Sequence, residues 1–167
     1  KAGIDHYTEF ANSTTSEYKL EKKDLAVDIG SNTGVLLNAF KKNKLNIMGV
    51  DPAQNICKVA KRKGIPTINS FFNRSSVQKI LNRYGKAKVV TGTNVFAHVD
   101  DLNLFVKNIK FLIDKKKGIF VIEAPHFLHL IKNLEYDTIY HEHLSYISVK
   151  PLISFFKKFK LEIIDVQ

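Results

Sequence analysis

A doubly wound α/β domain with a mostly parallel sheet is the fold that this sequence indicates. Short apolar runs alternate with segments of helical periodicity along most of the 167 residues, a pattern typical of parallel strands joined by helices. The first run leads into a tight glycine turn, Gly30 to Gly34, and the second run ends on a carboxylate, Asp51. In such a sheet a ligand lies over the carboxyl ends of the strands.

Six apolar runs are the expected strands, and six periodic segments are the expected helices. The strands are expected at Leu25–Ile29, Asn46–Val50, Pro66–Ile68, Lys88–Thr91, Gly118–Glu123 and Leu161–Val166. The helices are expected at Gly34–Lys42, Gln54–Lys63, Ser75–Tyr84, Asp101–Asp114, Phe127–Asn133 and Val149–Lys158. Residues 1–24 mix polar and aromatic side chains, which suits a lid or an access helix rather than a strand, so the domain proper is expected to span residues 25–167.

Composition indicates one globular domain. The length allows a sizeable core, and the hydrophobic content of 44% is ordinary for globular proteins. No apolar run approaches the roughly 18–20 residues that span a bilayer, and the N-terminus lacks a signal-peptide pattern. The single cysteine, Cys57, excludes an internal disulfide and any cysteine-based zinc site. We therefore expect a cytoplasmic protein without a metal ion, in which Cys57 fills a buried space.

The formal charge of +10 raises the question of a nucleic-acid partner. The excess is nearly all lysine, whereas recognition of bases and phosphates favours arginine, and the arginines are only Arg62, Arg74 and Arg83. The lysines are spread through every expected helix, which indicates solvated helix faces. We expect a monomer whose partner is a small molecule rather than a nucleic acid or a membrane, with some lysines helping to hold a diphosphate.

The spacing of the glycine turn favours an amino-acid ligand over a dinucleotide. A dinucleotide pyrophosphate is bound by G-x-G-x-x-G, whereas this turn reads D-x-G-x-x-x-G and begins at Asp28. An acidic group there repels a pyrophosphate and suits a cationic amino-acid tail. Asp51, about twenty residues past Gly30, can accept hydrogen bonds from both hydroxyls of an unphosphorylated ribose. S-adenosylmethionine has this ribose, this tail and a sulfonium charge; a glycine turn in another kind of α/β protein is the alternative interpretation.

Further cofactor contacts are expected at the turn and after two other strands. The turn is expected to contribute Gly30, Ser31, Asn32 and Gly34, with the two glycines letting the backbone approach the amino-acid tail. Asn94, after the fourth expected strand, is expected to border the methionine carboxylate or the reacting methyl group. Phe71 or Phe72, after the third, offers the adenine an apolar face, and a place in the core is the alternative for Phe71.

A dense polar segment, residues 135–146, follows the fifth expected strand and its helix. It holds two histidines, three carboxylates, three phenols and two hydroxyls, at the end of the sheet where an α/β domain binds its substrate. One interpretation is that these groups satisfy one another at a helix start. A second is a metal site, although His-x-His without a further spaced ligand is a weak zinc signal; its ligands would come from His141, His143, Glu142 and Glu123. The third is acid–base chemistry, because histidine titrates nearest neutrality.

Several segments resemble the sugar C-methyltransferase family, and the glycine turn resembles motif I of the class I methyltransferases. The Tyr-His-Glu-His stretch within residues 135–148, after Ile122-Glu123-Ala124-Pro125, is the specific part. The resemblance extends to the turn at 30–34, to residues 93–100, and weakly to residues 13–16. It implies a Rossmann-like class I methyltransferase fold and methylation of a ring carbon beside the keto group of a nucleotide-linked 4-keto-deoxysugar.

The resemblance also implies roles within the polar segment. Removing the proton α to a ketone gives an enolate, the carbon nucleophile that C-methylation needs. By the resemblance His143 is the base, and Glu142 and Tyr140 orient it or the sugar. His98 would lie across the pocket and donate to the enolate oxygen; its alternative is a capping or satisfied histidine before the helix start at Asp100-Asp101.

Some features depart from the family pattern. The family usually has a cysteine-based zinc module before this domain and a Rossmann-like domain after it, and these 167 residues contain neither, so we expect part of a longer polypeptide. We also expect the sheet to lack the antiparallel hairpin strand that normally follows. Thr33 stands where an acidic residue is common. The competing functions are a small-molecule O- or N-methyltransferase, a nucleic-acid methyltransferase and a domain that only binds cofactor.

Overall fold

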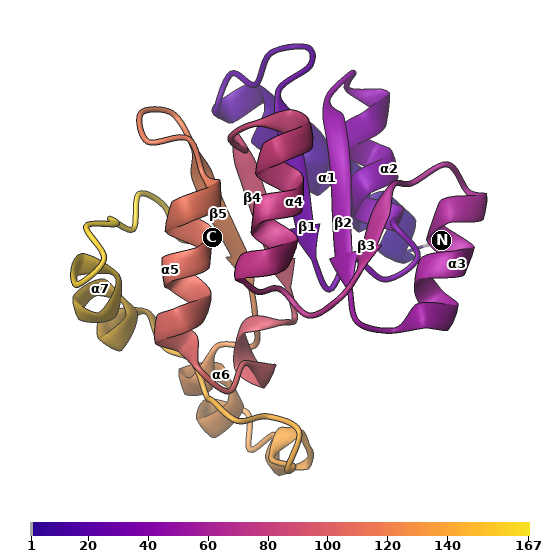
Figure 1. Ribbon diagram of the computed structural model, residues 1–167. Coiled ribbons are helices and arrows are strands. Elements are labelled where there is room, and N and C mark those ends of the chain that lie inside the picture. Colours follow the sequence, from indigo (N-terminus) through magenta and orange to yellow (C-terminus); the bar gives the residue numbers. More distant parts are fainter. Residues whose placement is uncertain (1) are drawn as a thin grey trace.

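A five-stranded parallel sheet is the frame of the structure, a computed structural model that describes residues 2–167, with side chains from residue 3 onward. The spatial order is β3-β2-β1-β4-β5, with helices on both faces (Figure 1). The strands are β1 (Leu25–Ile29), β2 (Asn46–Asp51), β3 (Thr67–Asn69), β4 (Val89–Thr93) and β5 (Ile119–Glu123). The α-helices are α1 (Ala2–Glu17), α2 (Val35–Lys42), α3 (Gln54–Arg62), α4 (Arg74–Tyr84), α5 (Leu102–Leu112), α6 (Phe127–Lys132) and α7 (Val149–Lys157). Two short 3₁₀ turns are η1 (Phe96–His98) and η2 (Tyr136–Thr138).

The strand order reverses between β1 and β4. The chain first builds outward through β2 and β3, then returns to place β4 and β5 on the other side of β1. The loops after β1 and β4 therefore lead to opposite faces, and such a reversal leaves a crevice for a ligand. Asp28 pairs with Thr91 in the β1–β4 register, so the polar end of β1 lies beside the end of β4.

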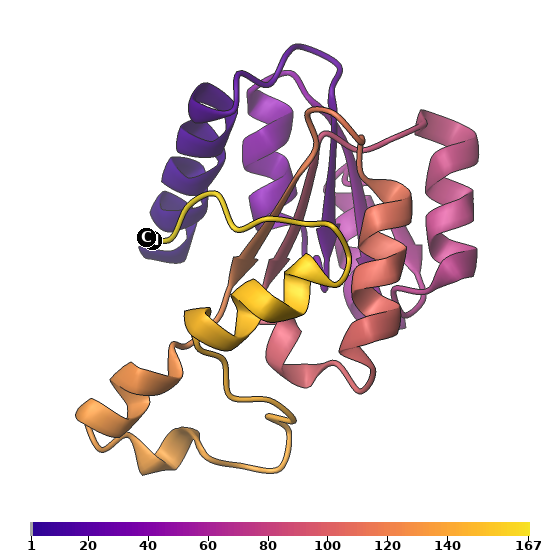
Figure 2. The ribbon, with the colours of Figure 1, turned by 90° about the vertical axis from the view of Figure 1, so that its left-hand side faces the viewer.

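Each face of the sheet has its own hydrophobic core. On one face, Leu37 and Phe40 of α2 and Ala11 of α1 are fully buried. On the other face, Phe105 of α5 and Phe156 of α7 are buried against the sheet. Figure 2 shows α1 and α2 on one side of the sheet and α5 on the opposite side. Burying a side chain the size of Leu37 or Phe40 contributes roughly 1.5–3 kcal/mol, and Ala11 lets α1 pack closely on α2.

The predicted doubly wound α/β fold is confirmed. Five expected strands and all six expected helices are present, with ends that differ by no more than two residues, and residues 2–17 form a helix as expected. The strand expected at Leu161–Val166 is wrong, because residues 161–167 join no ladder with the described strands. An apolar run becomes a strand only where a neighbouring backbone supplies hydrogen-bond partners. Leu161 and Ile163 instead pack their side chains against the core.

Surface and composition agree with several sequence-based expectations. Cys57 is buried at 2% exposure, as a small filler should be. Every lysine among residues 3–167 is exposed except Lys88, which is half-buried and pairs with Asp114 at 3.2 Å. The lysines within helices, such as Lys41, therefore lie on solvated faces as predicted, and others, such as those at 115–117, lie in exposed loops. Within residues 2–167, no helix combines the length and the apolar character that crossing a membrane requires.

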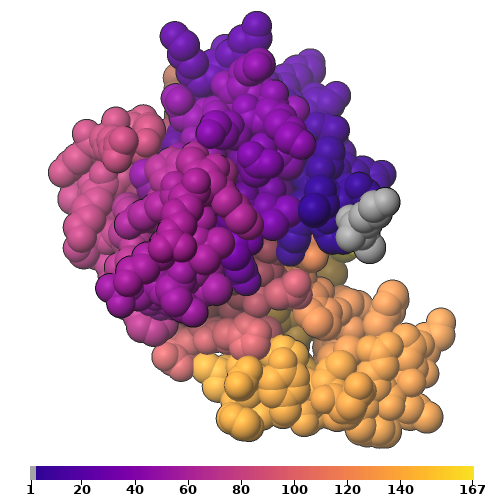
Figure 3. Space-filling model, turned by 90° about the vertical axis from the view of Figure 1, so that its right-hand side faces the viewer, coloured from indigo at the N-terminus to yellow at the C-terminus, as the bar shows by residue number. Residues whose placement is uncertain are grey.

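Residues 126–147 form an arm that leaves the body after β5 and returns at α7 (Figure 2). The arm is closed at its base by a bridge between His126 and Ile147, where the Phe127 N–H donates to the Ile147 carbonyl at 2.7 Å. Figure 3 shows the arm as an orange lobe, with a hollow between it and the indigo N-terminal helix. The polar segment 135–146 lies wholly within this arm.

Candidate active site

The turn after β1 is tied to the end of β2 by the carboxylate of Asp51. One carboxylate oxygen accepts a hydrogen bond from the Asn32 N–H and the other from the Ala53 N–H, each at 2.9 Å. Asn32 has a left-handed backbone (φ +48°), which asparagine tolerates better than most residues. Each carboxylate oxygen keeps a further lone pair, so Asp51 can also accept from hydroxyl groups of a ligand.

Asp28 is a buried carboxyl group beside the same turn. It is 3% exposed and accepts a hydrogen bond from the Thr91 hydroxyl at 2.6 Å. The pKa of the Asp28 carboxyl is raised to about 7, mainly because burial disfavours its charged form. The hydrogen bond from Thr91 lowers this pKa, and the charge of Asp51 raises it by a smaller amount. A buried carboxyl that ionises near neutrality favours a cationic neighbour, which agrees with the predicted place of an ammonium group.

A cavity of about 480 Å³ lies between the turn and the loop after β4. Its wall includes Asp28, Gly30, Asn32, Asn94 and Val95, together with Tyr7 of α1. The cavity lies where the strand order reverses, the usual ligand crevice of an α/β sheet. The structure thus brings together residues that the sequence places in two distant segments.

The two glycines of the turn lie against different residues. Gly30 and Gly34 have φ of +65° and +79°, a conformation that other residues rarely adopt. A Cβ on Gly34 would lie 2.7 Å from the side chain of Ile65, so Gly34 lets the turn pack against the segment before β3. Gly30 lines the cavity, and a Cβ there would lie 2.6 Å from Val95. We expected both glycines to let the backbone approach a ligand. Gly30 is placed to do so in the first cavity, whereas Gly34 packs against Ile65.

Ser31 turns its hydroxyl into the protein. The side chain is 3% exposed, and its Oγ has no hydrogen-bond partner among the described residues. It lies against Gly49 of β2, where any Cβ would collide with it. The Ser31 side chain therefore packs the turn against β2 at Gly49.

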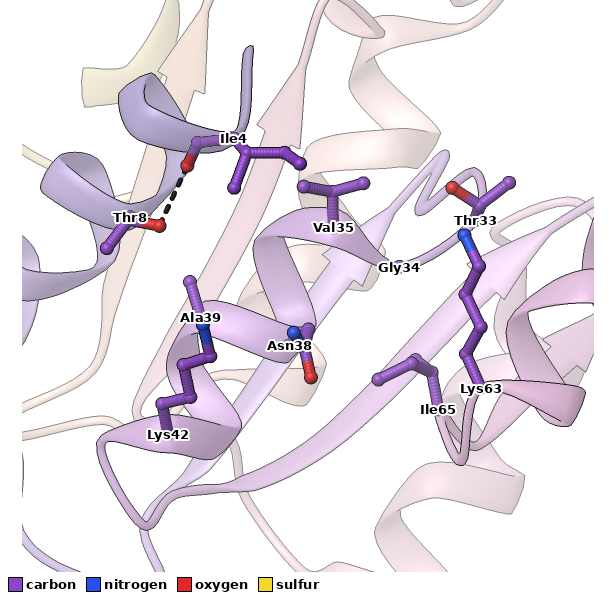
Figure 4. Close-up of a pocket in the computed structure, with 10 residues that line it drawn as sticks. All are labelled: Ile4, Thr8, Thr33, Gly34, Val35, Asn38, Ala39, Lys42, Lys63 and Ile65. Carbon is purple, nitrogen blue, oxygen red and sulfur yellow. Dashed lines mark hydrogen bonds between the residues drawn. The ribbon is translucent and has the colours of Figure 1, made fainter. Parts of the chain in front are cut away.

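A second cavity, of about 310 Å³, continues between α1 and α2 (Figure 4). It shares Thr33 and Val35 with the first cavity, and Thr8 of α1 lines its far wall. Lys63 extends from the end of α3 toward Thr33 (Figure 4). Of the residues predicted to bind cofactor, only Gly34 lines this space.

The two phenylalanines after β3 have different surroundings. Phe71 is 74% exposed, so its ring has a free face near the end of the sheet. Phe72 is half-buried, and its ring packs edge-on against Phe105 with centroids 5.3 Å apart. Phe72 thus belongs to the core, and Phe71 is the ring that remains available to a ligand.

The arm brings two histidines and a tyrosine together. The ring centroids of His98 and His143 are 4.9 Å apart, and those of Tyr140 and His143 are 4.3 Å apart. The Tyr140 hydroxyl lies 3.3 Å from Nε2 of His143. The Ala97 carbonyl, beside His98, accepts hydrogen bonds from the N–H groups of Leu144 and Ser145, which fixes the arm against the loop after β4.

Glu142 takes part in this cluster through its backbone. Its carbonyl accepts a hydrogen bond from Nδ1 of His98 at 2.7 Å, while its carboxylate is exposed and has no hydrogen bond to His143. Asp101 caps α5 by accepting from the Leu104 N–H at 2.9 Å, so His98 is not the cap, and the hydrogen bond of His98 to Glu142 is the contact that a satisfied histidine would make. His141 is exposed, and no three His, Cys, Asp or Glu side chains of residues 2–167 are grouped to hold a metal ion.

Helix α1 contributes two residues to the site that the sequence pattern does not indicate. Nε2 of His6 donates to the carboxylate of Glu123, at the end of β5, at 2.9 Å. Tyr7, the next residue, lines the first cavity. The aromatic character of the N-terminal segment was the available signal, and it indicated a lid without indicating which side chains face the cavity.

A family model described as "Methyltransferase domain" matches residues 6–166. The chain belongs to this methyltransferase family. One curated relative of this methyltransferase is C-methyltransferase NovU of Streptomyces niveus, 35% identical over 163 residues, which are 98% of this chain and 39% of that protein. The chain therefore spans about two fifths of the length of the curated relative it matches.

Solved methyltransferases share the fold. An S-adenosylmethionine-dependent methyltransferase from Clostridium acetobutylicum ATCC 824 superposes with a TM-score of 0.62 at 20% identity, over 78% of this chain and 54% of that one. The plantazolicin methyltransferase BpumL, in complex with a pentazolic desmethylPZN analog and SAH, gives a TM-score of 0.71 at 13% identity, over 94% of this chain and 65% of that one. The Rossmann-like class I methyltransferase fold is confirmed, and S-adenosylmethionine is the cofactor that family and fold support.

Proposed function

We propose that this methyltransferase domain acts on carbon, and that it methylates the ring carbon beside the keto group of a nucleotide-linked deoxysugar. The observation that carries the proposal is the cluster of His98, Tyr140 and His143 at the strand ends. Methylation of oxygen or nitrogen does not require a base that makes a carbanion, whereas methylation of a saturated carbon always does, so a histidine–tyrosine cluster favours a carbon acceptor. The 35% identity to a protein named as a C-methyltransferase supports the same choice.

The first cavity and its surroundings fit the cofactor. Asp51 accepts from the ribose hydroxyls, and ionised Asp28 faces the ammonium group. Asn94 borders the carboxylate or the methyl group, and the free ring of Phe71 offers the adenine a stacking face. When bound, S-adenosylmethionine supplies an electrophilic methyl group on a sulfonium.

His143 is the base in this proposal. A saturated carbon is not a nucleophile, so its proton must first be removed. Nε2 of His143 takes the proton α to the ketone, the C–H electron pair forms a C=C bond, and the carbonyl electrons move to oxygen. The enolate carbon then bonds the methyl carbon as the C–S bond breaks, the electron pair of that bond leaves with sulfur, and the ketone re-forms. A positioned base contributes roughly 10²–10⁴-fold in rate.

Residues 1–24 act as a lid on the domain formed by residues 25–167. Two contacts of α1 support this assignment: Tyr7 lines the first cavity, and His6 binds Glu123 at the end of β5. Helix α1 also packs on α2, directly after the glycine turn. A helix that touches both β5 and the cavity wall can shield the reacting groups from water.

The position of the transferred methyl group tests the proposed function. The complete protein would be incubated with S-adenosylmethionine labelled with ¹³C in the methyl group and with a thymidine-diphosphate-linked 4-keto-6-deoxyhexose. We expect the product's carbon spectrum to show the label bonded to the ring carbon next to the ketone. A label on oxygen or nitrogen would instead establish an O- or N-methyltransferase.

A further inference from the structure

Each of the two histidines of the site contacts a backbone carbonyl, and that contact sets which ring nitrogen carries the proton. Nδ1 of His143 lies 2.9 Å from the carbonyl oxygen of Thr138, and Nδ1 of His98 lies 2.7 Å from the carbonyl oxygen of Glu142. A carbonyl oxygen can only accept a hydrogen bond. Each neutral ring therefore carries its proton on Nδ1 and leaves Nε2 as an unprotonated acceptor.

This tautomer suits His143 as the base and identifies its neighbour as a donor. Since Nε2 of His143 has no proton, the Tyr140 hydroxyl at 3.3 Å must donate in their contact. A ketone has its oxygen and its α-carbon two bonds apart. For the base step the Tyr140 hydroxyl turns its single proton from Nε2 to the ketone oxygen, which frees the Nε2 lone pair to take the hydrogen of the α-carbon.

The same tautomer prevents neutral His98 from donating to an enolate. Its Nε2 has a lone pair and no proton, so it can only accept. Protonating His98 would place a cation beside a ring 4.9 Å away that itself becomes cationic when it takes the substrate proton. Like charges at this separation disfavour each other, so the charged form of His98 opposes the base step.

We propose that Tyr140 is the hydrogen-bond donor to the enolate oxygen, and that His98 accepts a hydrogen bond from a hydroxyl or amino group of the sugar. The carbonyls of Thr138 and Glu142 hold the two rings in the required tautomer. The proposal rests on the proposed carbon methylation. During that step the Tyr140 hydroxyl keeps its proton, His143 gains the proton from carbon, and the electron pair of the broken C–S bond leaves with sulfur.

Nuclear magnetic resonance tests the tautomers without turnover. The complete protein would be labelled with ¹⁵N in histidine, and long-range ¹H–¹⁵N correlations would show which ring nitrogen carries a proton. Spectra of His98→Gln and His143→Gln assign the signals. We expect Nδ1–H for both residues at a pH where the rings are neutral. A proton on Nε2 of His98 would overturn the proposal.

Exchange in D₂O tests the roles of the side chains. The ketosugar named above would be incubated with each variant and S-adenosylhomocysteine, and deuterium entering the carbon beside the ketone would be measured. Tyr140→Phe should slow exchange by about 10²–10³-fold, the scale of a lost oxyanion donor. His98→Gln should mainly raise KM for the sugar. Tyr136→Phe, an exposed phenol on the same arm, is the matched control and should exchange normally.

Two further outcomes are decisive. Normal exchange by Tyr140→Phe, with a slowed maximal rate in His98→Gln, would assign the donor to His98 and overturn the proposal. If the unmodified protein neither exchanges nor methylates any ketosugar, the proposed function fails and the roles of Tyr140 and His98 fail with it. In that event Nδ1–H signals would still support the tautomers that the two carbonyls impose.

Discussion

The carboxylate of Asp51 at the end of β2 accepts a hydrogen bond from the Asn32 N–H in the turn after β1, at 2.9 Å. A side chain that is expected to bind the ribose therefore also holds the turn that is expected to bind the amino-acid tail. The two halves of the cofactor site are one hydrogen-bonded unit. A change at Asp51 should consequently be felt at both ends of the cofactor.

Asp51→Ala should weaken S-adenosylmethionine binding by roughly 1–3 kcal/mol, because two hydroxyls lose a charged acceptor and the turn loses its tie. Asp51→Asn, which keeps one acceptor oxygen, should lose less. Calorimetric titration gives both affinities, and Asp165→Ala in the exposed C-terminal segment is the control. Unchanged affinity in Asp51→Ala, or tight binding of NAD by the unmodified protein, would contradict the assignment.

Asp28 should make the ligand-free protein less stable as the pH rises. Burial raises its pKa from the ordinary 3.8 to about 7 in the folded state. The folded protein thus holds the proton more tightly than the unfolded chain, so this contribution is complete below about pH 4 and is lost as the pH rises through 7. Asp28→Asn should remove roughly 1–4 kcal/mol of that pH dependence. Urea denaturation at pH 5 and at pH 8 gives the change in the free energy of unfolding between the two pH values. An equal change in the unmodified protein and in Asp28→Asn would refute the prediction.

Cofactor binding should release a proton from Asp28 near neutral pH. The ammonium group favours the ionised carboxylate and so lowers the pKa of Asp28 from about 7. At pH 7 roughly half a proton should leave per bound molecule, and affinity should fall below this pH. Titration calorimetry in two buffers of different ionisation enthalpy counts the proton. If the binding heat depends on the buffer equally in the unmodified protein and in Asp28→Asn, no proton leaves Asp28, and the ammonium group lies elsewhere.

Periodicity predicts most of the fold because burial on one or both faces leaves a pattern of apolar residues in the sequence. Val27 and Val90 are fully buried in adjacent strands, and continuous apolar runs are the mark of strands covered on both faces. Leu161–Val166 is an apolar run interrupted by Glu162 and Asp165, and it forms no strand. Whether an apolar run forms a ladder depends on a neighbouring backbone, which a local pattern does not contain.

The chemistry of the site is less predictable than its location. Residue types near Gly30 and His143 indicate where ligands bind, and the structure brings those segments to one end of the sheet. The sequence does not reveal that Glu142 acts through its carbonyl or that Gly34 makes room for Ile65. Those facts depend on main-chain paths and on contacts between distant segments.

Gly34→Ala should destabilise the fold through a contact outside the ligand cavity. The new Cβ would meet Ile65 at 2.7 Å, and the backbone at φ +79° costs a non-glycine residue roughly 1–2 kcal/mol by itself. Gly3→Ala is the matched control, since its Cβ meets nothing within 4 Å and a helical alanine stabilises by roughly 0.5–1 kcal/mol. Urea denaturation of both variants should give changes of opposite sign, and equal midpoints would refute the packing role of Gly34.

His143→Gln should remove methyl transfer while cofactor affinity stays the same. Nε2 of His143 is the only nitrogen in the pair with Tyr140 that can take the substrate proton, so the loss should reach about 10²–10⁴-fold. His141→Gln, two residues away and exposed, is the matched control and should methylate normally. Single-turnover rates and calorimetric affinities separate chemistry from binding. If His143→Gln methylates at the native rate, the base lies elsewhere and His98 is the next candidate. A metal ion that the unmodified protein binds and that both His141→Gln and His143→Gln lose would instead favour a metal site, against acid–base catalysis.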